Sequence, residues 1–349
     1  MSTFIDVLNQ YHAPFITAYQ DKLTPEMRCA ISRLGQCQTD NMGRAHWQCE
    51  DCHHQDAQPL SCGHRACPQC QHRTTADWVA RKQSSQLPVA HYMVTFTLPA
   101  QLRFLASKQA KALYSVMFQV AASVLKDFAA RKHGGQSGFT LVLHTHNRKR
   151  ALHPHIHAVV PGGFYDKARG QWHKGHKGYL YNAFALAKVW RARLLAAINQ
   201  HRQLSMPRSL PDKWVVDCRY IGRGPSVLKY LSRYLYRGVL PDKDIVSIEN
   251  GAVTFRYLDS KTQQWHTQTL PVLEFLWLIL QHVLPKGLQR VRDYGLMQGR
   301  AKVLRQQVLL LLIQLGMKVL ATVPRPRKAE RPCPKCQHAM RCTGISRPT

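Results

Sequence analysis

The chain has 349 residues, of which 49 are lysine or arginine and 19 are aspartate or glutamate, giving a formal net charge of +30. Hydrophobic residues make up 45% of the sequence, which is enough for a buried core and excludes a disordered tail. A positive surplus of this size is typical of proteins that bind polyanions, so nucleic acid is the expected partner.

The cysteines indicate metal sites. Of the 11, seven lie between Cys29 and Cys70 and three between Cys333 and Cys342, with two-residue gaps that are typical of metal ligation in a reducing compartment. The first ten residues lack the basic start and apolar run of a signal peptide, and the most apolar stretch, 308–313, is too short to span a membrane. We therefore expect a cytoplasmic, nucleoid-associated bacterial protein with no membrane partner.

The N-terminal third predicts helices followed by a metal-held segment. Residues 1 to about 35 have the pattern of short helices, and one of them begins where Thr24 can act as the cap and Pro25 occupies the first turn. Residues 36–73 are rich in Cys and His and show little periodicity. Because such a segment has few apolar residues to bury, we expect metal to hold it together.

The rest of the chain alternates strands and helices. The expected elements are a strand over 91–98, a helical region over 100–131, strands over 139–146 and 155–160, a helix over 181–203, a strand over 214–220, a helix over 226–237, a hairpin of 253–257 and 265–270, and helices over 272–284 and 301–321. This order predicts an α+β fold, with a mostly antiparallel sheet and helices packed on it.

Two Cys-x-x-Cys pairs predict a structural zinc site. Each pair can direct two thiolates at one ion, and four thiolates close the coordination shell of Zn²⁺. The predicted ligands are Cys49, Cys52, Cys67 and Cys70. Cys37 and Cys62 are candidate ligands of a further ion or neighbours of the first. A last run, Cys333-x-x-Cys336-x-His338-x3-Cys342, follows a Pro- and Arg-rich linker at 323–332 and could form a small knuckle.

A histidine-rich strand predicts a second kind of metal site. In His153-Pro154-His155-Ile156-His157, alternate residues of a strand point to the same face, so His155 and His157 present two imidazoles side by side. His144 and His146 have the same spacing on the neighbouring strand, and the third ligand stays open. The alternative is a run of histidines that stack on nucleic-acid bases.

Two tyrosines on one predicted helix are candidate nucleophiles. Tyr230 and Tyr234 are four residues apart and share a face, and Arg233 and Arg237 could hold phosphate oxygens. Tyrosines on helices usually pack in cores, which is the alternative here. Combined with a metal site, however, a tyrosine predicts a phosphodiester transesterase that forms a 5′-phosphotyrosine link and releases a 3′-hydroxyl.

A basic loop precedes the histidine strand. Arg148, Lys149 and Arg150 lie between the two strands that carry the histidines, and they are candidates for phosphate contacts with single-stranded DNA. The alternative is an ordinary solvated loop.

Together these motifs resemble one family. The segments CGHRACPQCQ, LHPHIHAVVPGG, VLKYLSRYLYR, VTFRYLDS and LPKGLQRVRDYG occur in an order similar to that of the rolling-circle transposases of the insertion sequence ninety-one family, from about residue 10 to residue 300. The resemblance implies that His155 and His157 hold the catalytic Mg²⁺ or Mn²⁺ and that Tyr230 and Tyr234 are the catalytic tyrosines. Relatives often carry His where this chain has Ala66.

The resemblance also implies the organisation of the chain. We expect a helical and zinc-binding domain over 1–85, an HUH-nuclease-like domain over 86–260, a helical extension over 261–322, and a basic linker with a small Cys cluster over 323–349.

The implied function is a DNA transposase that cleaves and rejoins single-stranded element ends and target DNA. The sequence has no G-x-x-x-x-G-K-[ST] nucleotide-binding loop, so host helicase and replication proteins are the expected partners for unwinding. The alternatives are a plasmid replication initiator or relaxase, a non-catalytic zinc DNA-binding protein, and a zinc hydrolase.

Overall fold

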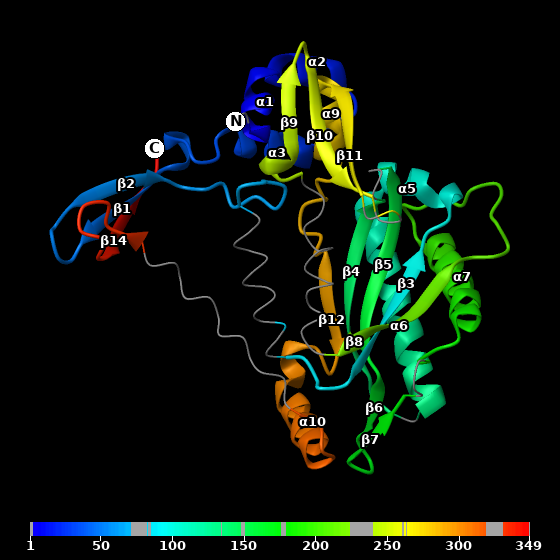
Figure 1. Ribbon diagram of the computed structural model, residues 1–349. Helices are drawn as coiled ribbons and strands as arrows, with labels where there is room; N and C mark the ends of the chain where they lie inside the picture. The colour runs from blue at the N-terminus through cyan, green and yellow to red at the C-terminus, as the bar shows by residue number, and fades with distance from the viewer. Residues whose placement is uncertain are drawn as a thin grey trace. The chain divides into compact units, whose positions relative to one another are not determined.

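The computed structural model describes residues 3–70, 82, 85–133, 135–147, 151–175, 179–223, 240–259, 262, 264–318 and 331–348 (Figure 1). The chain divides into two compact units, each assembled from separate stretches of sequence. Unit 1 consists of Met1–Ala80, Tyr236–Leu284 and Pro324–Thr349, and unit 2 consists of Arg81–Leu235 and Pro285–Val323.

In its described residues, unit 1 contains N-terminal helices together with a helix from later in the chain. These are α1 (Phe4–Gln10), α2 (His12–Tyr19), α3 (Pro25–Gly35) and α9 (Val272–Leu280). As the sequence predicts, Thr24 caps α3 by accepting a hydrogen bond from the Met27 amide at 3.2 Å, and Pro25 occupies the first turn. Thr3 and Asp6 cap α1 with a reciprocal pair of hydrogen bonds.

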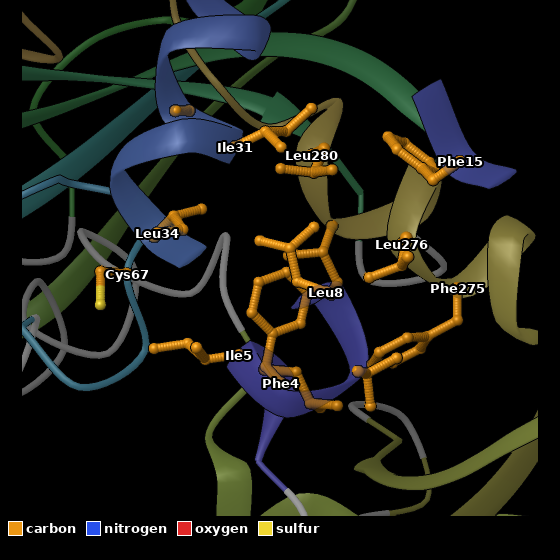
Figure 2. Packing of buried hydrophobic residues seen from close by; sticks show 14 of the residues in the cluster. Phe4, Ile5, Leu8, Phe15, Ile31, Leu34, Cys67, Phe275, Leu276 and Leu280 are labelled. Carbon is orange, nitrogen blue, oxygen red and sulfur yellow. The ribbon is translucent and has the colours of Figure 1, made fainter. Parts of the chain in front are cut away.

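The core of unit 1 joins the first helix to α9. Phe4 and Leu8 of α1 point toward Phe275 and Leu276 of α9, and all four side chains are fully buried (Figure 2). Burying such large side chains stabilises the folded state by about 1.5–3 kcal/mol each, before the entropy of ordering them is subtracted. Packing of these apolar faces therefore holds α1 against a helix that lies about 270 residues further along the chain.

A three-stranded sheet also belongs to unit 1. It has the order β11-β10-β9, all antiparallel, with β9 (Ile245–Glu249), β10 (Ala252–Leu258) and β11 (Trp265–Pro271). The predicted hairpin is thus present, with one more strand. Val253 and Phe255 alternate on β10 and are buried in the same core as Phe4. For this reason residues 245–258 lie in unit 1, although the sequence assigns them to the nuclease domain of 86–260.

A second sheet in unit 1 joins segments near the two ends of the chain. It has the order β13-β14-β1-β2 and contains β1 (Arg44–Cys49), β2 (Gln55–Pro59), β13 (Arg331–Pro332) and β14 (Ala339–Ser346). We call it the terminal ribbon. Sequence analysis finds no strand in 36–73, because most ribbon residues are polar and only partly buried and so show no apolar alternation. The C-terminal Cys cluster, expected as a separate segment, is part of this sheet.

Unit 2 is built on a five-stranded antiparallel sheet. Its order is β12-β4-β5-β3-β8, with β3 (Ala90–Thr97), β4 (Gly138–His146), β5 (Leu152–Pro161), β8 (Val216–Arg223) and β12 (Val291–Gly295). A separate hairpin follows β5 and consists of β6 (Gly163–Asp166) and β7 (Gln171–Lys174). The strand that carries the paired histidines, β5, is therefore the central strand of the sheet.

Helices cover one face of this sheet. They include α5 (Arg103–Lys108), α6 (Ala110–His133) and α7 (Ala183–Gln200), while α10 (Lys302–Gln314) packs near β7. Phe96 of β3 lies directly opposite Ile156 of β5, and its ring centroid is 5.0 Å from that of Trp190 in α7. Adjacent residues of a strand point to opposite faces, so the face that α7 covers is the one opposite His155 and His157. Arg193 of α7 pairs with Asp127 of α6 and fixes the two helices together.

The predicted α+β class, with an antiparallel sheet, packed helices and a Cys-rich domain, is confirmed. The described residues also form short 3-10 helices: η1 (Asp40–Met42), η2 (Ala100–Leu102), η3 (Asp242–Asp244) and η4 (Gly299–Ala301). The predicted helix at 226–237 lies outside the described residues. Within the described part of the chain, no helix has both the length and the apolar character needed to cross a bilayer.

Candidate functional site

Three histidines gather on one face of the unit 2 sheet. His155 and His157 lie on β5, and His144 on β4 is the direct cross-strand neighbour of His155. The ring centroids are 5.0 Å apart for His144 and His155, 4.5 Å for His144 and His157, and 4.8 Å for His155 and His157. One nitrogen from each ring lies within 4.8 Å of the others. We call these residues the histidine triad.

Hydrogen bonds orient two members of the triad. His155 Nδ1 is 2.7 Å from the His153 carbonyl oxygen, and because that oxygen only accepts, Nδ1 carries the proton. His157 Nδ1 is 3.0 Å from Thr95 Oγ1 on β3. In both rings a hydrogen bond engages Nδ1, so a metal would be held through Nε2; a hydrogen bond to the other ring nitrogen is the usual way in which neighbouring groups orient a metal-binding imidazole.

Burial keeps these imidazoles neutral. Burial, with a smaller contribution from the charges of neighbouring groups, lowers the pKa of His155 to about 4 and the pKa of His157 to about 3. Only a neutral imidazole nitrogen has a lone pair to offer a cation. His155 and His157 are therefore able to ligate a metal at neutral pH.

The other nearby histidines stay outside the triad. His153 Nδ1 accepts a hydrogen bond from the Arg103 guanidinium at 2.8 Å, and His146 Nδ1 is 2.8 Å from Thr145 Oγ1. The sequence could not decide between His144 and His146, because both have the same spacing. The register between β4 and β5 decides it, since His144 pairs with His155 whereas His146 pairs with Leu152.

Three imidazoles on one side of an ion suit a divalent cation with open positions. The chain would contribute only one half of the coordination shell, and phosphate oxygens or water could fill the rest. The donor set thus fits a catalytic cation better than a closed structural one.

The first cysteine cluster consists of Cys37, Cys62, Cys67 and Cys70. The Sγ atoms are 3.5 Å apart for Cys37 and Cys67, and 3.6 Å apart both for Cys37 and Cys70 and for Cys62 and Cys70. Four thiolates at about 2.3 Å from a tetrahedral Zn²⁺ would lie about 3.8 Å from one another. Backbone amides of Cys62 and His64 also point at sulfur atoms of the cluster, each at 3.4 Å. These residues fit a structural zinc ion.

The first cluster is part of the unit 1 core. Cys37 directly follows α3, and Cys37, Cys62 and Cys67 are buried among the same apolar residues as Phe4 and Leu34. Figure 2 shows Cys67 at the border of that packing. An ion there would fasten the loop after β2 to the helical core.

The second cysteine cluster consists of Cys49, Cys52, Cys333 and Cys336 in the terminal ribbon. The Sγ–Sγ distances are 3.4 Å for Cys49 and Cys336, 3.4 Å for Cys52 and Cys336, and 3.6 Å for Cys52 and Cys333. None of the cysteines in the described residues forms a disulfide.

These two clusters correct the predicted cysteine pairing. The sequence combines Cys49 and Cys52 with Cys67 and Cys70 in one site, whereas the structure divides the two pairs between separate clusters. The physical reason lies in the local fold. β1 and β2 form a hairpin that brings Cys49 and Cys52 next to β13 and β14, whereas Cys67 and Cys70 pack beside α3 in the core of unit 1. Cys37 and Cys62, the candidate further ligands, complete the first cluster.

Several predicted site residues lie outside the described residues. They are Tyr230, Tyr234, Arg233, Arg237, Arg148, Lys149 and Arg150. Their proposed roles rest on the sequence.

Two family models match the chain. Residues 138–304 match the family Y2_Tnp, described as "Putative transposase", and residues 7–98 match the "Transposase zinc-binding domain" Zn_Tnp_IS91. The first match includes the histidine triad, and the second includes the first cysteine cluster. Cys333 and Cys336 lie beyond both.

Two curated proteins are similar over most of their length. "Putative transposase y4qJ" of Sinorhizobium fredii is 29% identical over 352 residues, which cover 94% of this chain and 86% of the relative. "Transposase for insertion sequence element IS801" of Pseudomonas savastanoi pv. phaseolicola is 28% identical over 294 residues, which cover 77% of this chain and 70% of the relative.

Among solved structures, the conjugative relaxase TrwC in complex with oriT DNA aligns with a TM-score of 0.28 and 17% identity, over 65% of this chain and 72% of that chain. Its metal-bound form aligns with the same TM-score, over 66% of this chain and 73% of that chain.

The two family matches and the two named transposases agree with each other and with the cysteine and histidine clusters. The chain belongs to the transposases of the insertion sequence ninety-one family, enzymes that act on DNA and carry an N-terminal zinc-binding domain.

Proposed function

We propose that this transposase cleaves and rejoins single-stranded DNA by tyrosine transesterification, with Tyr230 and Tyr234 as nucleophiles and a divalent cation on the histidine triad. The observation that carries the proposal is the triad itself. Three imidazoles gather on one sheet face, and two of them are oriented by hydrogen bonds and kept neutral by burial, within the part of the chain that matches a transposase family. A merely structural role would not need this geometry.

The reaction conserves the energy of the phosphodiester bond. The phenol oxygen of one tyrosine attacks phosphorus, a phosphotyrosine bond forms, and the bond from phosphorus to the 3′-oxygen breaks. The phenol proton leaves and the 3′-oxygen takes up a proton, so a free 3′-hydroxyl is released. In the reverse step, a 3′-hydroxyl attacks the phosphotyrosine and restores the tyrosine together with an intact strand.

The triad supports this step by holding the cation. His155 and His157 would hold it through Nε2, with His144 as the third ligand, while Thr95 and the His153 carbonyl keep two of the rings in position. Bound there, Mg²⁺ or Mn²⁺ supplies Lewis-acid polarisation of the scissile phosphate. This charge stabilisation is what allows a phenol with an ordinary pKa of about 10 to act near neutral pH.

Two tyrosines would allow two successive cleavages. Each could hold one 5′ strand end, as cutting an element from one site and joining it to another requires. Arg233 and Arg237 are proposed to hold phosphate oxygens beside the tyrosines, and Arg148, Lys149 and Arg150 to contact the backbone of single-stranded DNA.

Structural zinc in the first cysteine cluster belongs to the same proposal, with Cys37, Cys62, Cys67 and Cys70 as its ligands. Four thiolates leave the ion no open position, so its role is to stabilise the fold of unit 1. We further propose that a host helicase supplies duplex unwinding.

The test is a covalent adduct assay. A labelled single-stranded oligonucleotide that carries an element end is incubated with the full-length protein and Mn²⁺ or Mg²⁺, and adducts that survive denaturing gel electrophoresis are counted. We expect a metal-dependent adduct in the wild type and none in the Tyr230→Phe/Tyr234→Phe double variant. The Tyr220→Phe variant, which changes an exposed tyrosine on β8, is the matched control and should form the adduct normally.

DNA binding by the wild type without any adduct, over several candidate end sequences, would contradict the proposal. That result would favour a non-catalytic zinc DNA-binding protein. Strand cleavage with no covalent link to protein would instead favour a metal-dependent hydrolase.

A further inference from the structure

The terminal ribbon contains two turns of the same shape. In one, Cys49 and Cys52 lie at the tip of the β1–β2 hairpin, and the Cys49 amide donates to the His54 carbonyl at 2.9 Å. In the other, Cys333 and Cys336 lie between β13 and β14, and the Cys333 amide donates to the His338 carbonyl at 2.8 Å.

The match extends to the backbone of the two turns. In each, the residue after the second cysteine has a left-handed conformation, with φ of 57° at His53 and 64° at Gln337. Neither residue is glycine, so each adopts this conformation at an energetic cost. A backbone that is bent in the same strained way at two places, with both cysteine pairs facing one another, indicates a shared purpose at the sulfur atoms.

We propose that Cys49, Cys52, Cys333 and Cys336 form a second zinc centre, which fastens the C-terminal segment of the chain to the N-terminal hairpin. The four Sγ atoms lie within 4.8 Å of one another, and three of the distances between them are 3.4–3.6 Å. This spacing is close to the separation of about 3.8 Å that four thiolates have around a tetrahedral Zn²⁺. Binding would release the thiol protons and leave no open position, so the centre is structural.

Contacts around the cluster place it independently of any ion. β14 pairs with β1 from Arg44 to Cys49, so the strands bring the two turns together. Cys49, Cys333 and Met340 are buried against one another, and Arg331 forms an ion pair with Asp56 of β2. The sheet therefore presents a preformed four-sulfur site, which reduces the entropy lost when a metal binds.

This centre would take half of its ligands from outside the part of the chain that matches the family's zinc-binding domain. That domain matches residues 7–98, and so contains Cys49 and Cys52 but neither Cys333 nor Cys336. Half of the ligands thus come from a region about 280 residues later in the chain. A structural ion here would close this long loop of chain and hold the last strand in the sheet.

The first experiment measures zinc in the purified full-length protein by plasma mass spectrometry. The Cys333→Ser/Cys336→Ser variant should hold one zinc ion fewer per chain than the wild type, and Cys49→Ser/Cys52→Ser should show the same loss. Cys342→Ser, which removes an exposed cysteine of β14 outside the cluster, should hold as much zinc as the wild type. An unchanged zinc content in both double variants would overturn the proposal.

The second experiment uses the wild-type protein and so does not depend on the folding of a variant. Cysteine alkylation is followed by peptide mass spectrometry before and after chelation. With zinc bound, Cys52 and Cys336 should react more slowly than the control Cys342, and chelation should remove the difference. The Cys52 side chain is exposed to solvent, so slow alkylation of Cys52 would result from the bound ion and not from burial. Reaction of Cys52 and Cys336 at the rate of Cys342 in the zinc-loaded protein would refute the second centre, whatever the strand-cleavage activity is.

Discussion

The histidine triad and the two cysteine clusters were formed by different kinds of contact. The triad comes from two strands that are adjacent in sequence, β4 and β5, and their register brings His144, His155 and His157 together. The cysteine clusters join segments that lie further apart, 33 residues for Cys37 and Cys70 of the first cluster and 287 residues for Cys49 and Cys336 of the second. The comparison teaches that strand periodicity identifies a local ligand set, whereas the choice of partner for a Cys-x-x-Cys turn depends on the tertiary fold.

The same difference separates the expected roles. The triad leaves coordination positions open and needs only the sheet beneath it, so its removal should affect chemistry and leave the fold intact. The cysteine clusters are closed, and their removal should affect the fold of unit 1 first.

The largest expected effect is on strand cleavage. The His155→Ala/His157→Ala variant should lose at least about 10³-fold in the rate of adduct formation, because the cation that stabilises charge on the phosphate no longer binds. Adduct yield against time, with saturating oligonucleotide, measures the loss. His146→Ala, on β4 but outside the triad, serves as the control and should keep the wild-type rate. A double variant that unfolds like wild type and still cleaves at full rate would remove the triad from the mechanism.

The next effect is on stability. Cys62→Ser should lower the free energy of unfolding by about 3–4 kcal/mol, because loss of one ligand releases the zinc of the first cluster and leaves a polar hydroxyl in the core. Chemical denaturation followed by tryptophan fluorescence measures it. Cys29→Ser, at an exposed position on α3, should change it by no more than about 0.5 kcal/mol. Equal effects of the two substitutions would argue against zinc in the first cluster.

His144→Ala distinguishes a ligand from a neighbour. We expect a loss of about 10²-fold in cleavage at low Mn²⁺, partly recovered at high Mn²⁺, because two histidines remain to bind the ion more weakly. The dependence of the initial rate on Mn²⁺ concentration measures it. If the rate falls by the same factor at every Mn²⁺ concentration, His144 does not act as a ligand.

The smallest effect concerns Thr95, whose hydroxyl contacts His157 of the triad. Thr95→Val keeps the shape of the side chain but removes the hydroxyl 3.0 Å from His157 Nδ1, so that this ring is held less firmly. We expect a loss of metal affinity of about tenfold. Isothermal titration with Mn²⁺ measures it. The control is Thr254→Val on β10 of unit 1, which removes a hydroxyl that contacts Thr269 and should bind Mn²⁺ as the wild type does. Wild-type affinity in Thr95→Val would show that the hydroxyl does not orient the ligand.

Much of the fold could be predicted from the sequence. Apolar and β-branched residues located β3, β4 and β5, and helical periodicity located α6 and α7, because these elements bury one or both faces. The strand β8 was also located, although Val216 alone is buried in it. The sequence pattern did not predict the strands of the terminal ribbon. Its strands are largely exposed or half-buried. They are held by backbone hydrogen bonds between strands that are distant in sequence and by the cysteine-containing turns, and neither feature gives a local alternation of apolar residues.

The same distinction between local patterns and long-range contacts applies to the candidate site. His155 and His157 could be named from spacing alone, and the choice between His144 and His146 required the register. The cysteines could be predicted as metal ligands, but they could not be assigned to individual sites, since each Cys-x-x-Cys turn is compatible with several partners. The assignment of β9–β11 to unit 1 also depended on long-range packing, in which Val253 and Phe255 are buried against α1.

The measurement that tests the central claim most directly is the location of the DNA on the protein. The adduct formed with Mn²⁺ is trimmed with nuclease and digested with protease, and the modified peptide is sequenced by mass spectrometry. The account predicts a nucleotide linked through a 5′-phosphate to Tyr230 or Tyr234, and no such peptide without metal. A modified peptide that carries the link on any other residue would contradict it.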